Sequence, residues 1–180
     1  MRTILPHEKN PLLREKAEDV TVSEIKNKHI QTLIKEMRML LAKEEHGVAL
    51  AAPQVGEPLR LFIVSGRALA RDARNAPGEK KKIEGVFPPL PDEIYINPDL
   101  LKLSREKNNK HEGCLSIRGK WGMVPRAEKA TIRAYNEKGE CFTRGASGFL
   151  AHIFQHEIDH LQGILYIDKA KKIYDEQKEK

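Results

Sequence analysis

One short stretch near the C-terminus constrains the fold more than any other part of the sequence. Residues 156–160 read HEIDH, with His156 and His160 four positions apart. On a helix, residues with this spacing lie on the same face, one turn apart. Phe149 and Ile153 precede them on that face, so the histidines extend an apolar stripe and should point inward. Two buried imidazoles without partners would be energetically unfavourable, so this helix predicts a buried polar site.

Two inward imidazoles at this spacing can bind one divalent metal ion. Glu157, which lies between them, can then act as a general base toward water. The alternative is a charged stretch on an exposed helix face, which the apolar residues before His156 disfavour. A catalytic metal site needs a third protein ligand and an open position, so the rest of the sequence must supply one more donor.

Cys114 is the better candidate for this third ligand. It lies beside a glycine in the segment 111–116, HEGCLS. A thiolate with two imidazoles suits iron, nickel, cobalt or zinc. A buried, inert cysteine remains the alternative, and Cys141 is expected to be such a core residue. His152 lies one turn before His156, but three ligands along a straight helix do not surround a tetrahedral ion, so we expect it to support the ligands or to line the pocket wall. The other histidines also lie upstream: His7, His29, His46 and His111.

Composition places the chain among ordinary globular proteins. Its 180 residues favour one domain. The first thirty residues do not resemble a signal or transit peptide, and no apolar run is long enough to span a membrane. We therefore expect a cytoplasmic protein, in which Cys114 and Cys141 stay unbridged.

The net charge of +6 comes partly from short lysine clusters at 80–82 and 169–172. Solvated surface is the simpler interpretation, and affinity for RNA or a ribosome surface is the alternative. No nucleic-acid-binding motif supports specific recognition of DNA or RNA.

Hydrophobic periodicity predicts the first half of the fold. A helix is expected over about residues 23–44, begun by a capping box at 21–24 and ended before Gly47. Small residues between two glycines at 47–56 suit close approach to a ligand. A buried strand is expected at 59–64 and a long surface loop at 66–92. The apolar stripe of the helix consists of Ile30, Leu33, Ile34, Met37, Leu40 and Leu41.

The second half predicts short strands at 93–97 and 100–104, on either side of Pro98. A hairpin at 130–135 and 141–144 then leads into a helix over about residues 147–162. The charged tail from Lys169 is expected to be helical or frayed. Strands followed by one buried helix predict an α+β domain with helices packed on an antiparallel or mixed sheet.

Three motifs in order resemble those of the peptide deformylases. They are the small-residue segment Gly47 to Gln54, the segment Glu112 to Ser116, and the helix His156 to His160. The resemblance extends from Leu5-Pro6 to about Asp168. It implies small mixed or antiparallel sheets around a central C-terminal helix carrying HExxH, with a catalytic domain at 1–168 and a charged tail at 169–180.

The resemblance also implies an activity. The enzyme would remove the formyl group from the N-terminal formyl-methionine of nascent polypeptides and release formate. Ferrous iron would be the native ion, with zinc, nickel or cobalt as alternatives. The expected partners are formyl-methionyl nascent peptides and, transiently, the ribosome surface, without a membrane or a specific nucleic acid.

The resemblance assigns roles to individual residues. Cys114, His156 and His160 would hold the metal, while Glu157 would take a proton from water. The side-chain amide of Gln54 and the backbone N–H of Leu115 would stabilise the oxyanion. Substrate contacts are expected from Val48, Ala49, Leu50, Glu112, Phe149, His152 and Ile153. Supporting roles fall to Gly47, Gly113 and Arg126, and Glu112 also matches a position that supports the site.

One departure from the family motif stands out. Ala49 occupies a position where the family usually has glycine, and its methyl group should narrow the cleft and alter affinity while activity is retained. Two other functions stay open at this point. A zinc endopeptidase would use the same helix with a histidine or carboxylate as third ligand. A catalytically inactive ribosome-binding protein would lack a ligand or Glu157, and this sequence has them all.

Overall fold

A computed structural model of the protein describes residues 2–74 and 90–175. In these ranges, eight strands and four α-helices surround a core in the manner expected of an α+β domain. The helices are α1 (Lys28–Lys43), α2 (Gly66–Arg74), α3 (Gly148–Leu161) and α4 (Tyr166–Lys169), with short 3-10 turns at His7–Lys9, Pro11–Arg14, Val22–Glu24 and Ala52–Val55. The strands are β1 (Ala49–Ala51), β2 (Leu61–Val64), β3 (Glu93–Leu103), β4 (Lys107–Cys114), β5 (Ile117–Ala127), β6 (Lys129–Tyr135), β7 (Cys141–Ser147) and β8 (Lys172–Asp175).

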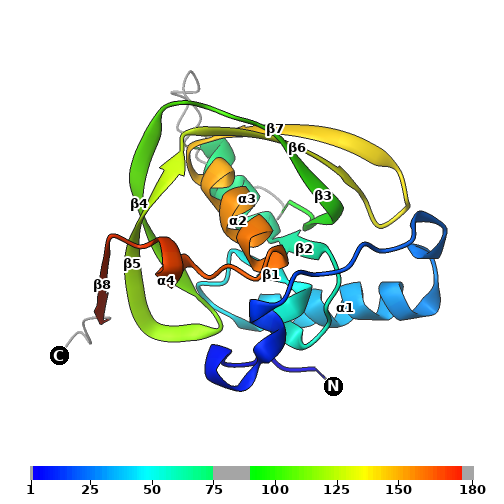
Figure 1. Cartoon of the computed structure of the whole chain (residues 1–180). Helices are drawn as coiled ribbons and strands as arrows, with labels where there is room; N and C mark the ends of the chain where they lie inside the picture. Colours follow the sequence, from blue (N-terminus) through cyan, green and yellow to red (C-terminus); the bar gives the residue numbers. More distant parts are fainter. Residues whose placement is uncertain (1, 75–89, 176–180) are drawn as a thin grey trace.

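The strands form two antiparallel sheets, with order β1-β2-β3-β6-β7 in one and β4-β5-β8 in the other. Figure 1 shows α3 at the centre of the molecule, with β6 and β7 passing over one side and β4 and β5 on another. This arrangement confirms the predicted fold, in which antiparallel sheets pack around a central C-terminal helix.

The antiparallel pair of β1 and β2 separates two apolar clusters, because successive side chains of a strand point to opposite faces. Ala49 and Ala51 face α3, together with Phe62 of β2. Leu50 faces α1 instead. One edge of β1 pairs with β2, and β1 ends the sheet. Strand β1 is therefore packed between α3 on one face and α1 on the other.

Helix α1 confirms the predicted apolar stripe but not the predicted start. Five of the six stripe residues are buried, and Leu40 is partly buried against the same cluster. The helix begins at Lys28, where Oδ1 of Asn27 accepts a bond of 2.9 Å from the N–H of Ile30. The capping box at Thr21 is absent, since Thr21 precedes a short 3-10 turn and its side chain makes no cap bond. Asparagine supplies the N-terminal acceptor equally well.

Strand β3 joins the two short strands that the sequence predicts. A shift in register against β6 between Ile96 and Asp99 absorbs Pro98, as a bulge does. The β6–β7 hairpin is confirmed, with Gly139 at φ 77° in its turn. Cys141 is exposed at the start of an edge strand, so its prediction as a core residue was wrong.

Two segments differ from expectation. Residues 66–74 form α2 where the sequence predicts a surface loop, because Ala68 and Leu69 bury themselves against α3. The remainder of that predicted loop at 75–89 lies outside the described residues. In the tail, Lys172–Asp175 pairs with β5 as strand β8, whereas we expected a helix or frayed chain.

In the described parts of the chain, no helix has both the length and the hydrophobicity that a membrane span requires.

Candidate active site

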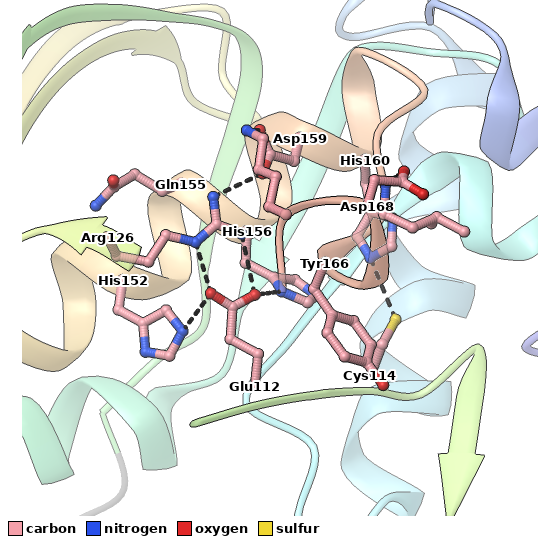
Figure 2. Close-up of polar contacts among 12 residues, drawn as sticks. Glu112, Cys114, Arg126, His152, Gln155, His156, Asp159, His160, Tyr166 and Asp168 are labelled. Carbon is pink, nitrogen blue, oxygen red and sulfur yellow. Dashed lines mark hydrogen bonds and ion pairs between the residues drawn. The ribbon is translucent and has the colours of Figure 1, made fainter. Parts of the chain in front are cut away.

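Three side chains from distant parts of the sequence meet at the centre of the fold. The donor atoms of Cys114, His156 and His160 all lie within 4.8 Å of one another. Cys114 ends β4, and both histidines come from α3. The Sγ atom of Cys114 lies 3.3 Å from Nε2 of His160 (Figure 2). The structure thus brings together the thiol and imidazoles that the sequence nominates as a metal-ligand set.

Glu112 fixes the orientation of His156. Its Oε2 atom lies 2.7 Å from Nδ1 of His156, so Nδ1–H donates to the carboxylate and Nε2 is left as the atom that a metal ion would bind. The ring of Tyr166 stacks on the other side of the same imidazole, with centroids 6.2 Å apart. Burial alone would lower the pKa of His156, but hydrogen bonds with Cys114 and Glu112 outweigh it and hold that pKa well above the usual histidine value. A metal ion bound at Nε2 would displace that proton.

A buried guanidinium lies behind these groups. Arg126 donates to both oxygens of Glu112, at 2.5 and 3.0 Å, and to Asp159 at 2.6 Å. His152 Nε2 adds a contact of 2.9 Å with Oε1 of Glu112. Burial alone would raise the pKa of Glu112. Hydrogen bonds from Arg126, His152 and His156 outweigh it and hold that pKa well below the usual glutamate value.

Asp159 links this network to the end of the chain, because Lys169 donates to its other oxygen at 2.6 Å. Gln155, one turn earlier, exchanges two hydrogen bonds of 2.9 Å with the backbone of Ala127. These contacts tie α3 to β5 and so set the distance between the histidines and Cys114. The sequence analysis gave no role to Asp159 or Gln155, whose motif positions were visible but whose partners were not.

Glu157 has a different environment from Glu112. Burial raises its pKa to about 7. Its Oε2 atom is buried and without a hydrogen-bond partner among the described residues. Nδ1 of His160 shares this condition, and burial lowers the pKa of His160 well below its usual value. A carboxyl group whose pKa lies close to neutral, and which lacks a hydrogen-bond partner, is suited to exchange protons with a bound molecule.

The 3-10 turn after β1 places Gln54 against the same centre. Its Oε1 accepts from the N–H of Ala51 at 2.8 Å, which fixes the amide plane. Its Nε2 then lies 3.4 Å from Sγ of Cys114 and 3.3 Å from Oγ of Ser116. Gln54 is buried, as a donor within the site requires.

These groups open into a cleft of about 1070 Å³. One wall comes from residues 44–49, which lead into β1, and another from residues 111–115 and 117–121 of β4, β5 and the turn between them. Helix α3 closes the cleft with Phe149, His152 and Ile153. The side chain of Leu50 does not line it, because it points toward α1.

The remaining predicted residues fall into place around this cleft. Leu115, Val48, Ala49 and Gly47 line it, and Trp121 packs on Gly113, where an added Cβ would come within 3.3 Å of the indole. Trp121 and the α2 residues Arg67 and Arg71 also line the cleft. The sequence analysis missed these three because no motif includes them.

Comparison with known proteins agrees with this geometry. The family model for polypeptide deformylase matches residues 1–176. A peptide deformylase from Halothermothrix orenii is 40% identical over 167 residues, covering 93% of this chain and 92% of the relative. One from Desulforudis audaxviator is 36% identical over 168 residues, covering 92% and 91%.

A solved structure adds the same result at the level of the fold. The crystal structure of peptide deformylase from Thermotoga maritima has a TM-score of 0.76 and 28% identity, covering 96% of this chain and 99% of that one. Together with the site in the C-terminal half of α3, these matches show that the chain belongs to the polypeptide deformylase family.

Proposed function

We propose that this cleft removes the formyl group from N-terminal formyl-methionine, the reaction of the family, with the residues named in the sequence analysis as its working parts. The observation that carries the proposal is that an amide donor and a base line one cleft together with two of the three candidate metal ligands. The Gln54 amide lies against the Cys114 thiol, and Glu157 occupies the same cleft beside His156.

The three donors fit a divalent metal ion. Cys114, His156 and His160 offer one soft and two borderline ligands at mutual distances of at most 4.8 Å. When bound there, such an ion polarises the carbonyl and makes water nucleophilic at neutral pH. Family members are metal-dependent hydrolases, and ferrous iron is the ion we propose here. Zinc, nickel and cobalt suit the same donors, and a ferrous site with a thiolate should be sensitive to oxygen.

Glu157 and Gln54 then divide the remaining work. Glu157 removes the proton from the attacking water and returns it to the leaving amine, a role that its pKa of about 7 suits. Attack on the formyl carbon develops negative charge on the carbonyl oxygen. The Gln54 amide and the Leu115 N–H donate to that oxygen, and one fixed donor of this kind is worth about 3 kcal/mol.

The substrate backbone pairs with the free edge of β1, in the manner of strand addition. Val48, Ala49 and Leu50 provide the main-chain partners. The methionine side chain enters the apolar pocket formed by Phe149, Ile153 and the ring of His152 on the α3 side. Glu112 and Arg126 orient the site from behind. Gly47 leaves room for the side chains of Glu44 and Leu41, and Gly113 leaves room for the ring of Trp121.

The cellular setting follows from the substrate. We propose that the protein acts in the cytoplasm on nascent chains and contacts the ribosome surface transiently, without binding membranes or specific nucleic acid. Residues 1–168 form the proposed catalytic unit, and the tail 169–180 is attached to it through Lys169 and β8.

Formate release from formyl-Met-Ala-Ser tests the proposal, with protein loaded anaerobically with ferrous iron. Rapid release is expected from the wild type. Glu157→Ala should abolish turnover while the metal content stays unchanged, because Glu157 is not a ligand. Near-normal turnover by metal-loaded Glu157→Ala would contradict the mechanism. Cleavage of internal peptide bonds without formate release would point to an endopeptidase instead.

A further inference from the structure

Helix α2 gives the cleft a positively charged wall that the catalytic reaction does not use. Arg67, Ala68 and Arg71 line the cleft, and their spacing places them on one face of the helix. Both guanidinium-bearing residues are exposed. We propose that Arg71, assisted by Arg67, selects formylated peptides with an acidic side chain at the third residue. This inference rests on the proposed function and adds a substrate preference to it.

Both arginines are held in place without being neutralised. Arg67 donates to the carbonyl oxygens of Leu41, Glu44 and Glu45 at 2.8 to 3.4 Å. The guanidinium carbon of Arg71 lies 4.5 Å from the ring centroid of Phe149. Within residues 2–74 and 90–175, neither side chain forms an ion pair with a carboxylate. A fixed cation at a cleft wall is therefore available to a ligand.

The nearby acidic groups leave most of this charge uncompensated. Asp72 is not among the residues that line the cleft, and its Oδ1 accepts from the N–H of Leu150 at 3.1 Å. Glu44 forms a double hydrogen bond with Arg118, at 2.7 and 3.1 Å. Glu45 is exposed in the cleft wall and offsets part of the charge. At this end of the cleft, the two positive charges of α2 therefore outnumber the one unpaired negative charge, that of Glu45.

The position of α2 fixes which part of a substrate it meets. The reacting end lies beside Gln54, after the C-terminal end of β1. Arg67 binds the carbonyl oxygens of residues 41–45, before the N-terminal end of β1. A peptide paired with β1 therefore runs antiparallel to it, from Gln54 toward Glu45. Its third residue lies about 7 Å beyond the first, in the direction of α2.

Side-chain alternation completes the assignment. The first side chain, methionine, points toward α3 in the proposed complex. In an extended chain the third side chain points the same way and the second points oppositely. Helix α2 packs on this same side, because Ala68 and Leu69 share an apolar cluster with Ile153 and Phe154 of α3. The third side chain therefore faces Arg71, and the second does not.

The test compares kcat/KM for formyl-Met-Ala-Glu-Ser and formyl-Met-Ala-Lys-Ser. The wild type should prefer glutamate by about two- to fivefold at low salt, as expected for an exposed ion pair, and less at high salt. Arg71→Gln should bring the ratio close to one, and Arg71→Glu should reverse it. Lys35→Ala removes one positive charge from the exposed side of α1 and should leave the ratio unchanged.

Two further measurements separate the possible failures. When glutamate and lysine are compared at the second residue of the peptide instead of the third, the ratio of their kcat/KM values should lie closer to one. A wild-type ratio of one or below, or a preference that Arg71→Glu leaves intact, would overturn the proposed selectivity. If no peptide releases formate from metal-loaded protein, the proposed function itself fails. Binding of a formyl-Met-Ala-Glu peptide to metal-loaded Glu157→Ala then still reports on Arg71.

Discussion

Nδ1 of His156 donates a hydrogen bond of 2.7 Å to Oε2 of Glu112, and this contact connects a proposed metal ligand to the buried Arg126. The carboxylate thus serves two purposes at once. It selects the imidazole tautomer, and it neutralises a guanidinium that has almost no access to water. Its loss should affect both metal binding and stability.

Glu112→Gln tests the first of these effects. Glutamine has one oxygen in place of two and cannot accept from Arg126, His152 and His156 together. We expect metal affinity to fall by about 10- to 100-fold, as for other groups that orient metal-bound imidazoles. Competition with a chromophoric chelator measures this change. Glu24→Gln, at an exposed position, is the control and should bind metal as the wild type does.

Stability should depend on pH through the same carboxylate. The pKa of Glu112 is lower in the folded protein than in the unfolded chain. Its contribution is therefore fully present above the unfolded pKa of about 4.3 and decreases as pH falls toward the folded pKa. Urea unfolding of metal-free protein at about pH 6 and about pH 3.5 should show a steeper loss for the wild type than for Glu112→Gln. Parallel losses in the two proteins would contradict this assignment.

The two cysteines provide a matched pair for testing the ligand set. Cys114 lies at the proposed metal position, and Cys141 is exposed on β7. Protein loaded with cobalt should show a thiolate-to-metal absorption band, because a sulfur ligand donates charge to the ion. Cys141→Ala should keep this band and Cys114→Ala should lose it. A band that survives in Cys114→Ala would require another thiol ligand.

Asp72 should stabilise the helix that carries both histidines. Its Oδ1 accepts from the N–H of Leu150 in the first turn of α3, whereas Ser147 at the N-cap makes no side-chain bond. Loss of a capping bond costs about 0.5–2 kcal/mol. We expect Asp72→Ala to lower the free energy of unfolding by this amount in denaturant titrations. Asp72→Asn retains an oxygen acceptor and should lose less.

Ala49→Gly would restore the residue that the family motif usually carries. The Ala49 side chain is only 5% exposed and packs in the cluster around α3, so its removal leaves a small void. Glycine also adds backbone freedom to the unfolded chain, and together these effects should cost about 1–2 kcal/mol of stability. Because the methyl group borders the cleft, we expect a change in KM for formyl-Met-Ala-Ser with kcat nearly unchanged. A change in kcat alone would show that Ala49 affects the reacting groups.

The sequence alone determined the elements whose residues repeat with a clear period. The apolar stripes of α1 and α3 are local patterns, and their periods do not depend on partners. The histidine pair was predictable for the same reason, since a spacing of four on a helix fixes a common face. Cys114 was a candidate ligand because it lies beside a glycine, whereas the role of Gln54 came only from the resemblance to the peptide deformylases.

Only the tertiary structure decided the remainder. The segment 66–74 is only nine residues long, too short for its period to establish a helix by itself, and it becomes α2 because Ala68 and Leu69 meet α3. Strand β8 forms because the edge of β5 accepts it. Likewise, the sequence places Glu112, Arg126 and Asp159 far apart, and only the packing of α3 against β4 and β5 unites them in one buried network. Contacts between distant segments are set by packing, which has no local signature in the chain.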